Sequence, residues 1–173
     1  MAVTLSGNLN LLWSILDQRT AVTGAANESG SRSISLGSTI TIVSGTAAGQ
    51  VDKVWSDTRV VTTGATDSID LAGTLTDSFT AVTTFVKVRA ILAVAAGANT
   101  TTLSAARPAA NGSILFAAAS DQIAGVSFGG IIFAWADLQA GVAVAAGTTD
   151  LFSVINSAGA SATYSIAVLG TSA

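Results

Sequence analysis

The sequence has 173 residues, a length that is typical of one domain and sufficient to bury a hydrophobic core. Half of its residues are hydrophobic, 10% are charged and the formal net charge is -3, which argues against intrinsic disorder and against a protein that neutralises nucleic-acid phosphates. Cys and His are absent, so disulfides, thiolate nucleophiles, imidazole bases and metal sites built on these residues are excluded.

The N-terminal segment at residues 9–20 is open to two interpretations. Its apolar residues Leu9, Leu12, Trp13 and Leu16 follow helical spacing, whereas an extended arm would give a similar pattern in so short a segment. A short helix and an arm are therefore both retained. Because these four apolar residues precede the β-strand pattern, we predict that they bind a partner.

A polar loop at residues 24–32 follows this segment and is the clearest linker in the sequence. It separates the N-terminal segment from a region with the alternation of β-strands. We therefore predict an N-terminal arm or helix with its loop at residues 1–32 and a β-sandwich domain at residues 33–173.

From residue 33 onward, apolar residues recur with a period of two, as they do in half-buried strands. Residues 33–43 alternate Ile and Leu with Ser and Thr, and residues 83–94 alternate apolar residues with Lys87 and Arg89. Further strands are predicted at residues 114–118, 131–135, 142–146, 151–155 and 163–169.

Turns rich in Gly or Asn separate these strands, for example at Gly129-Gly130 and Gly147. The strands recur about every 8–12 residues, a spacing typical of an antiparallel sandwich or barrel and unlike that of alternating strands and helices. The sequence therefore predicts an all-β fold, an antiparallel and jelly-roll-like β-sandwich with a short N-terminal arm or helix.

The sequence shows no targeting or membrane segment. No Lys or Arg precedes Arg19, and no apolar run near the N-terminus resembles a secretory signal. The roughly 20 predominantly apolar residues that a spanning helix needs are not found in any one stretch. We therefore expect neither a cleaved signal nor a membrane partner.

Asp67, Asp70 and Asp77 form the densest group of carboxylates, and closely spaced oxygen ligands suit calcium. The segment lacks the D-x-[DN]-x-[DN]-G pattern of a calcium-binding loop and its distal Glu, so carboxylates that accept backbone N–H bonds at turns are the favoured interpretation. Glu28, the only Glu, lies in the polar loop, and no phosphate-binding loop is present. We predict no catalytic residue, no metal and no cofactor.

Four basic residues, Lys53, Arg59, Lys87 and Arg89, are candidates for a strip that faces an acidic partner. Aspartates neighbour the first two in sequence. Exposed ion pairs on a sheet face are therefore the favoured interpretation, because such pairs are common and individually weak.

An ordered set of short segments covers most of the chain between residues 51 and 170. They are Trp55 with Asp57 and Arg59, the DLAGTLTD segment, the FVKVRAI strand, the Gly129-Gly130 turn, the AGVAVAAGTTDL segment and a final strand ending in Leu169-Gly170. Together these segments resemble a family of small virion proteins of tailed bacteriophages.

The resemblance implies a β-sandwich structural protein of the phage particle, without enzymatic activity. It most directly implies a head decoration or cement protein whose copies, as a homotrimer, bridge neighbouring subunits of the major capsid protein. The expected partners are the chain itself and the major capsid protein, with no nucleic acid, and the expected location is the virion after synthesis in the host cytoplasm. A tail or fibre component that recognises the host surface is the alternative, and a carbohydrate-active enzyme is a third possibility.

Overall fold

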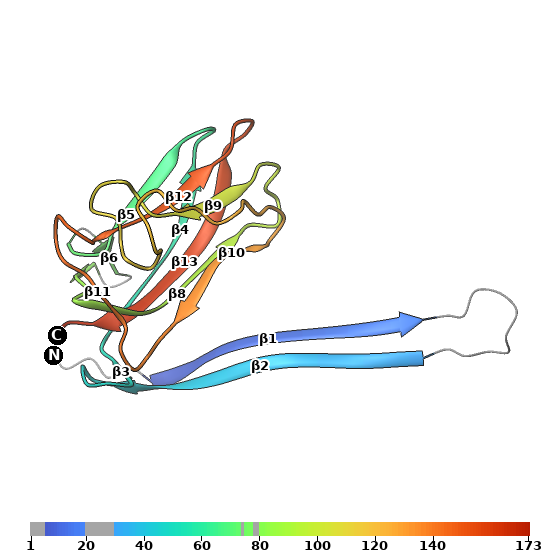
Figure 1. The fold of residues 1–173 in the computed structure, drawn as a ribbon, viewed down its shortest axis with the longest axis horizontal. Helices are drawn as coiled ribbons and strands as arrows, with labels where there is room; N and C mark the ends of the chain where they lie inside the picture. Colours follow the sequence, from blue (N-terminus) through green and yellow to red (C-terminus); the bar gives the residue numbers. More distant parts are fainter. Residues whose placement is uncertain (1–5, 20–29, 74, 78–79) are drawn as a thin grey trace, which may run out of the picture. The chain divides into compact units, whose positions relative to one another are not determined.

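The computed structural model describes residues 6–19, 30–73, 75–77 and 80–173. All regular secondary structure in these ranges is β-strand (Figure 1). The predicted all-β fold is therefore confirmed. Within the same ranges, no helix is present that is long and apolar enough to cross a membrane. The strands are β1 (Ser6–Arg19), β2 (Gly30–Ser44), β3 (Gln50–Val51), β4 (Lys53–Val61), β5 (Thr66–Asp70), β6 (Leu75–Thr76), β7 (Val82–Thr83), β8 (Lys87–Ala95), β9 (Leu103–Ala106), β10 (Ile131–Ala136), β11 (Val142–Ala143), β12 (Leu151–Asn156) and β13 (Ala162–Thr171).

Strands β1 and β2 are hydrogen-bonded neighbours and form a long hairpin (Figure 1). The strands are 14 and 15 residues long, and residues 6–42 make up a compact unit distinct from the one that contains residues 43–173. The helical interpretation of residues 9–20 is therefore wrong, and the extended arm is the observed form. The physical reason is that every second residue from Leu9 to Ile15 is apolar, a strand pattern that the helical spacing had obscured.

The boundary predicted at residue 32 lies inside β2, which begins at Gly30. Of the predicted polar loop, residues 24–29 lie outside the described part of the chain. At its far end, β2 pairs in parallel with β3, Val43 with Gln50 and Ser44 with Val51.

Two antiparallel sheets form a sandwich in the unit that contains residues 43–173 (Figure 1). One sheet has the strand order β10-β8-β13-β4, with β11 also paired to β8. The other has the order β5-β12-β9, and backbone hydrogen bonds from residues 121–126 extend it beyond β9. The predicted antiparallel sandwich is confirmed, whereas the jelly-roll connectivity stays a prediction.

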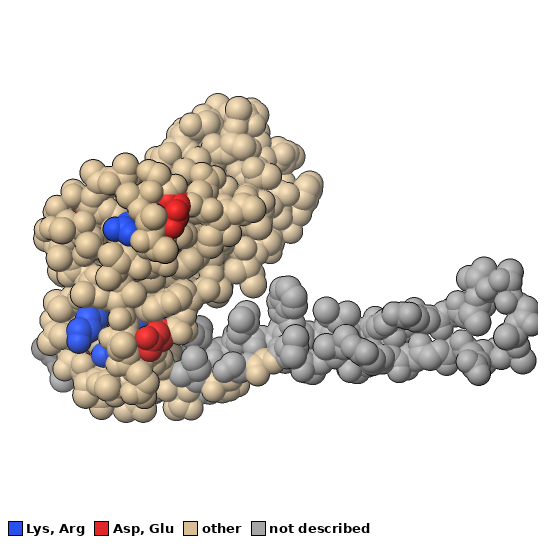
Figure 2. Space-filling model, viewed as in Figure 1, with Lys and Arg blue, Asp and Glu red and all other residues tan. Residues whose placement is uncertain are grey.

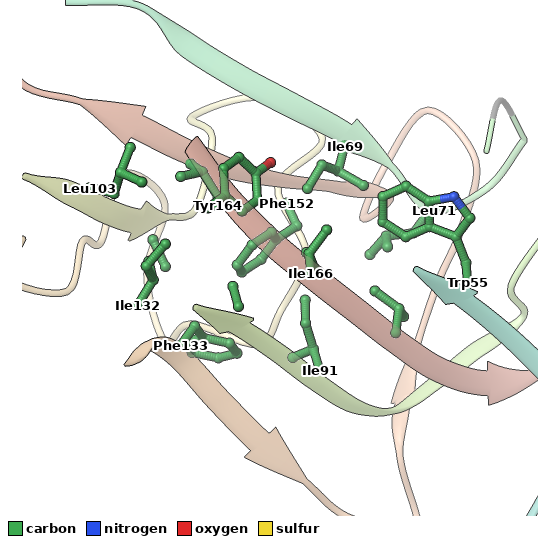
Figure 3. Close-up of a cluster of buried hydrophobic side chains, with 14 of the residues drawn as sticks. Trp55, Ile69, Leu71, Ile91, Leu103, Ile132, Phe133, Phe152, Tyr164 and Ile166 are labelled. Carbon is green, nitrogen blue, oxygen red and sulfur yellow. The ribbon is translucent and has the colours of Figure 1, made fainter. Parts of the chain in front are cut away.

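The hydrophobic core fills the space between these two sheets (Figure 3). Alternate residues of β13, namely Tyr164, Ile166 and Val168, face Phe152 and Val154 of β12, and all five are buried. Burial of each large apolar side chain stabilises the fold by roughly 1.5–3 kcal/mol. The other strands and connections add Trp55, Ile69, Leu71, Ile91, Leu103, Ile132 and Phe133.

The predicted strand at residues 114–118 is wrong, because these residues form turns and bends. Their apolar character has another cause. The Phe116 ring packs with its centroid 5.2 Å from that of Phe133 and 6.2 Å from that of Phe152, so the loop contributes to the core without joining a sheet. The strand predicted at 142–146 shortens to β11. The strands predicted at 83–94, 131–135, 151–155 and 163–169 correspond to β8, β10, β12 and β13.

Candidate interaction surfaces

The outer edge of β1 is the first candidate surface. Among the described strands β1 has only β2 as a neighbour, so its other edge presents backbone N–H and C=O groups that none of these strands pairs. At about 3.3 Å per residue, 14 residues give an edge roughly 45 Å long. Such an edge is a template for a strand from another chain.

All four residues predicted to bind a partner lie on β1. Alternate residues of a strand share a face, so Leu9 and Trp13 fall on one face of β1 while Leu12 and Leu16 fall on the other. Helical spacing would place these four residues on one face, whereas the strand places two of them on each face. The structure does not describe their side chains, so their role stays a prediction.

A shallow groove on the outer face of the larger sheet is the second candidate surface. Its volume is about 550 Å³, and it runs over β4, β13 and β8. The register places Ser165 of β13 between Thr58 of β4 and Val94 of β8, and Ala167 opposite Leu92. The groove is lined by Ser56, Asp57, Thr58, Leu92, Val94, Ser165, Ile166 and Ala167.

Three of the four polar side chains that line this groove have partners within the chain. The Thr58 and Ser165 hydroxyl oxygens lie 3.1 Å apart, and the Asp57 carboxylate accepts hydrogen bonds from the Thr58 backbone N–H and from Arg59. Charged side chains are also sparse over the face of the molecule seen in Figure 2, as the composition predicts.

A charged cluster joins the two sheets at the β4 edge. Arg59 Nε and Nη2 of β4 donate hydrogen bonds of 2.5 and 2.8 Å to the two carboxylate oxygens of Asp67 on β5. The Tyr164 hydroxyl of β13 donates to the same carboxylate at 2.8 Å. The Arg59 guanidinium holds the pKa of Asp67 below its usual range, whereas burial, followed by the hydrogen bond to Asp67, raises the pKa of the Tyr164 hydroxyl.

The other two aspartates of the predicted carboxylate group accept backbone hydrogen bonds at turns. Asp70 accepts from the Ala72 N–H at 2.8 Å, and Asp77 accepts from the Ala81 N–H at 2.9 Å. This is the turn role predicted for them. In the described part of the chain, no three acidic side chains gather in a way that could hold a metal ion. Backbone N–H groups also donate to Asp52, Asp57, Asp121, Asp137 and Asp150.

The candidate basic strip does not form, because Arg89 is buried with 1% of its surface exposed. Its guanidinium donates to the backbone carbonyls of Leu138 and Gln139, at 2.8 and 2.5 Å. The prediction of an exposed ion pair at Arg89 is therefore wrong. The register between β8 and β13 shifts at this point, and the connection after β10 lies over the side chain. Arg59 forms the predicted exposed ion pair with Asp57, and it also forms a less exposed pair with Asp67 that the sequence did not predict.

An exposed aromatic residue, Phe128, was missed by the sequence reasoning. Its side chain is in the turn that precedes β10, it is 73% exposed, and its backbone has φ +52°. The available signal was its position next to the predicted Gly129-Gly130 turn, where an apolar residue has no reason to be buried.

Comparison with known proteins gives no family assignment. No family model matches the chain, and no curated protein or solved structure matches it. A functional proposal therefore depends on the surfaces described above and on the sequence resemblance.

Proposed function

We propose that this chain is a non-enzymatic structural protein of a bacteriophage virion, a capsid decoration or cement protein that bridges and stabilises major capsid subunits. The β1–β2 hairpin carries the proposal. A two-stranded ribbon is at best marginally stable alone in water, yet β1 presents an edge of 14 residues without a third strand among those described. Pairing with a strand of a neighbouring subunit would satisfy this edge and hold the two chains together.

The composition of the chain supports an assembly role. Interface cores are depleted in charged residues, and only 10% of this chain is charged. The aspartates whose side chains are described accept hydrogen bonds in turns and form ion pairs, so they have structural roles. An assembly role uses these features directly, whereas an enzymatic role would need a further group of reactive residues.

In the proposed mechanism, copies of the chain associate, as a homotrimer, and each copy contacts the major capsid protein. Burial of apolar surface contributes roughly 25 cal/mol per Å². Several weak contacts made at once give an avidity that far exceeds that of a single contact. A shell crosslinked in this way would resist the outward pressure of packaged DNA.

The number of copies per purified phage particle tests the location. Quantitative mass spectrometry against the major capsid protein should give hundreds of copies for a decoration protein. A handful of copies would contradict the head assignment and favour the tail or fibre alternative, in which the chain recognises the host surface.

Two adjacent proline substitutions test the role of the β1 edge. Successive N–H groups of a strand point to opposite edges, so one of Leu11→Pro and Leu12→Pro removes an outward N–H and the other removes one that pairs with β2. The outward variant should fold like the wild type by circular dichroism and lose binding to capsid shells that lack the chain. Wild-type binding by both variants would exclude strand pairing at this edge.

A further inference from the structure

Asn111 is the only asparagine in the sequence that is followed by glycine, and it lies in the loop after β9. In an unconstrained chain an Asn-Gly pair is chemically labile, because the glycine nitrogen can attack the asparagine side-chain amide without obstruction by a Cβ. Asn111 is exposed, so water has access to it. The backbone conformation at Asn111 and Gly112 therefore determines whether this pair reacts.

The backbone of Asn111 keeps the two reacting groups apart. Its φ is +57°, in the left-handed region, where ψ of a residue other than glycine is about +30° to +60°. At such a ψ the Gly112 nitrogen lies anti to the Asn111 Cβ across the Cα–C bond. Attack closes a five-membered ring, which requires this nitrogen and the Cβ to lie on the same side of that bond. The Asn111 ψ must therefore leave the left-handed region before the pair can react.

Hydrogen bonds on both sides of the pair hold this conformation. The Leu151 N–H of β12 donates to Asn111 O at 2.9 Å, and the Ser113 N–H donates to Leu151 O at 2.8 Å. Arg107 Nε donates to Gly112 O at 3.2 Å. Gly112 is also closely enclosed, since a Cβ there would lie 2.3 Å from a backbone carbonyl oxygen. The peptide unit that has to rotate is thus fixed to β12 and to the start of its own loop.

We propose that Asn111 is a deamidation site that the fold keeps unreactive and that reacts with water when the pairing of residues 111–113 with β12 opens. In the open loop the Gly112 nitrogen attacks Asn111 Cγ, the proton of Gly112 N–H leaves with the side-chain nitrogen as ammonia, and a succinimide forms. Water then cleaves one of two ring C–N bonds. Cleavage at Cγ leaves aspartate, and cleavage at the backbone carbonyl carbon leaves isoaspartate, whose chain runs through Cγ.

Isoaspartate lengthens the chain by one carbon inside a closely packed loop. The additional carbon lies between the Cα of residue 111 and the carbonyl that would accept from the Leu151 N–H. The bonds to Leu151 and the bond from Arg107 to Gly112 O cannot then all keep their geometry, so the reaction makes the opening permanent. The isoaspartyl product, separated by ion exchange, should melt below Asn111→Asp, which carries the same charge on a chain of normal length. Equal melting temperatures would overturn this consequence.

Peptide mass spectrometry of the full chain measures the reaction, because each event converts an amide into an acid. In urea, where the chain is unfolded, Asn111 should deamidate faster than Asn99 and Asn156, which precede threonine and serine. In the folded chain the rate at Asn111 should fall by at least about tenfold, because reaction then requires local opening. Equal rates at Asn111 in the folded and unfolded chains would overturn the protection by the fold. A stable Asn111 in urea would overturn the site itself.

Two variants distinguish local opening from global unfolding. Arg107→Met removes the bond to Gly112 O and should speed deamidation of the folded chain about tenfold. Gly170→Ala crowds β13 in the larger sheet, and should leave the rate within about twofold although it lowers global stability. Equal acceleration by both variants, or none by Arg107→Met, would overturn local opening. Where Arg107→Met does not fold, hydrogen exchange of the wild-type Leu151 N–H reports the opening, and exchange as slow as that of the central β13 amides would overturn it.

Discussion

Replacing Asp67 with Asn tests how strongly the charged cluster at the β4 edge stabilises the sandwich. The wild-type carboxylate accepts three hydrogen bonds, two from Arg59 and one from Tyr164. Asn keeps a single oxygen acceptor and loses the charge. The buried Tyr164 hydroxyl and the guanidinium must then share one neutral acceptor.

The expected loss follows from the exposure of the two ion-pair partners. Hydrogen bonds to a charged group contribute about 1.5–3 kcal/mol each. The Arg59 side chain is 31% exposed and that of Asp67 is 15% exposed, so solvent screening reduces the total. We expect unfolding to cost about 2–3 kcal/mol less, which lowers the melting temperature by about 4–12 °C for a domain of this size.

Asp57→Asn is the matched control. It removes the same charge beside the same arginine, but Asp57 is 45% exposed and lies 3.1 Å from Arg59. Its effect should stay below about 0.5 kcal/mol. Chemical denaturation followed by Trp fluorescence compares the two variants, since Trp55 is buried in the core. Equal losses would refute the reasoning, because the effect would then depend on net charge and not on the geometry at Asp67.

Three further predictions concern the sandwich. Arg59 lowers the pKa of Asp67, so the contribution of the Asp67 carboxylate to stability is present above its unfolded pKa of about 3.9 and is lost as pH falls through its folded pKa. The difference in unfolding free energy between wild type and Asp67→Asn should therefore be constant from about pH 5 to 8 and shrink below about pH 4. A difference that grew on acidification would contradict this role of Arg59. Arg89→Met should lower the free energy of unfolding by about 2–4 kcal/mol, because the Leu138 and Gln139 carbonyls lose a charged donor, and Arg89→Lys should recover part of this loss. Urea unfolding measures both variants. An unchanged midpoint for Arg89→Met would show that the buried guanidinium does not stabilise the connection after β10. Gly170→Ala should lower the free energy of unfolding by about 1–3 kcal/mol, because a Cβ there would lie 2.2 Å from Lys87 O and 2.5 Å from Phe85 Cδ1. The control Gly97→Ala should change the melting temperature little, because its Cβ would have no atom within 4 Å. Similar melting temperatures for both variants would contradict the close packing at Gly170.

The strands that the sequence predicts well are those with uninterrupted apolar alternation. β13 is the example, because one of its faces enters the core and leaves a period of two. β4 was not predicted, since Asp57 and Arg59 interrupt its apolar pattern and its position at a sheet edge leaves much of it exposed. An edge strand needs less apolar sequence than a central strand, so pattern alone underestimates it.

Tertiary contacts explain the remaining differences between the sequence-based predictions and the structure. The burial of Arg89 depends on carbonyls about fifty residues away, and no local pattern reports such a distant connection. Phe116 has the apolar signature of a strand because its ring packs onto the core from a loop. At the candidate surfaces, the extended arm was one of the two alternatives retained, whereas the groove arises only when β4, β13 and β8 come together.

The position of β13 also determines when the sandwich can form during synthesis. This strand pairs with β4 on one side and β8 on the other, yet both neighbours precede it in the chain by more than sixty residues. While residues 162–171 remain inside the ribosome, β4 and β8 lack the strand that lies between them, so the two strands cannot join into one sheet. The β1–β2 hairpin depends on near neighbours in sequence and can form early, because local contacts form faster than distant ones. A nascent chain would therefore have a transiently paired arm and unpaired β4 and β8 strands before its body has folded, and chaperones that shield unpaired strands would act in that interval.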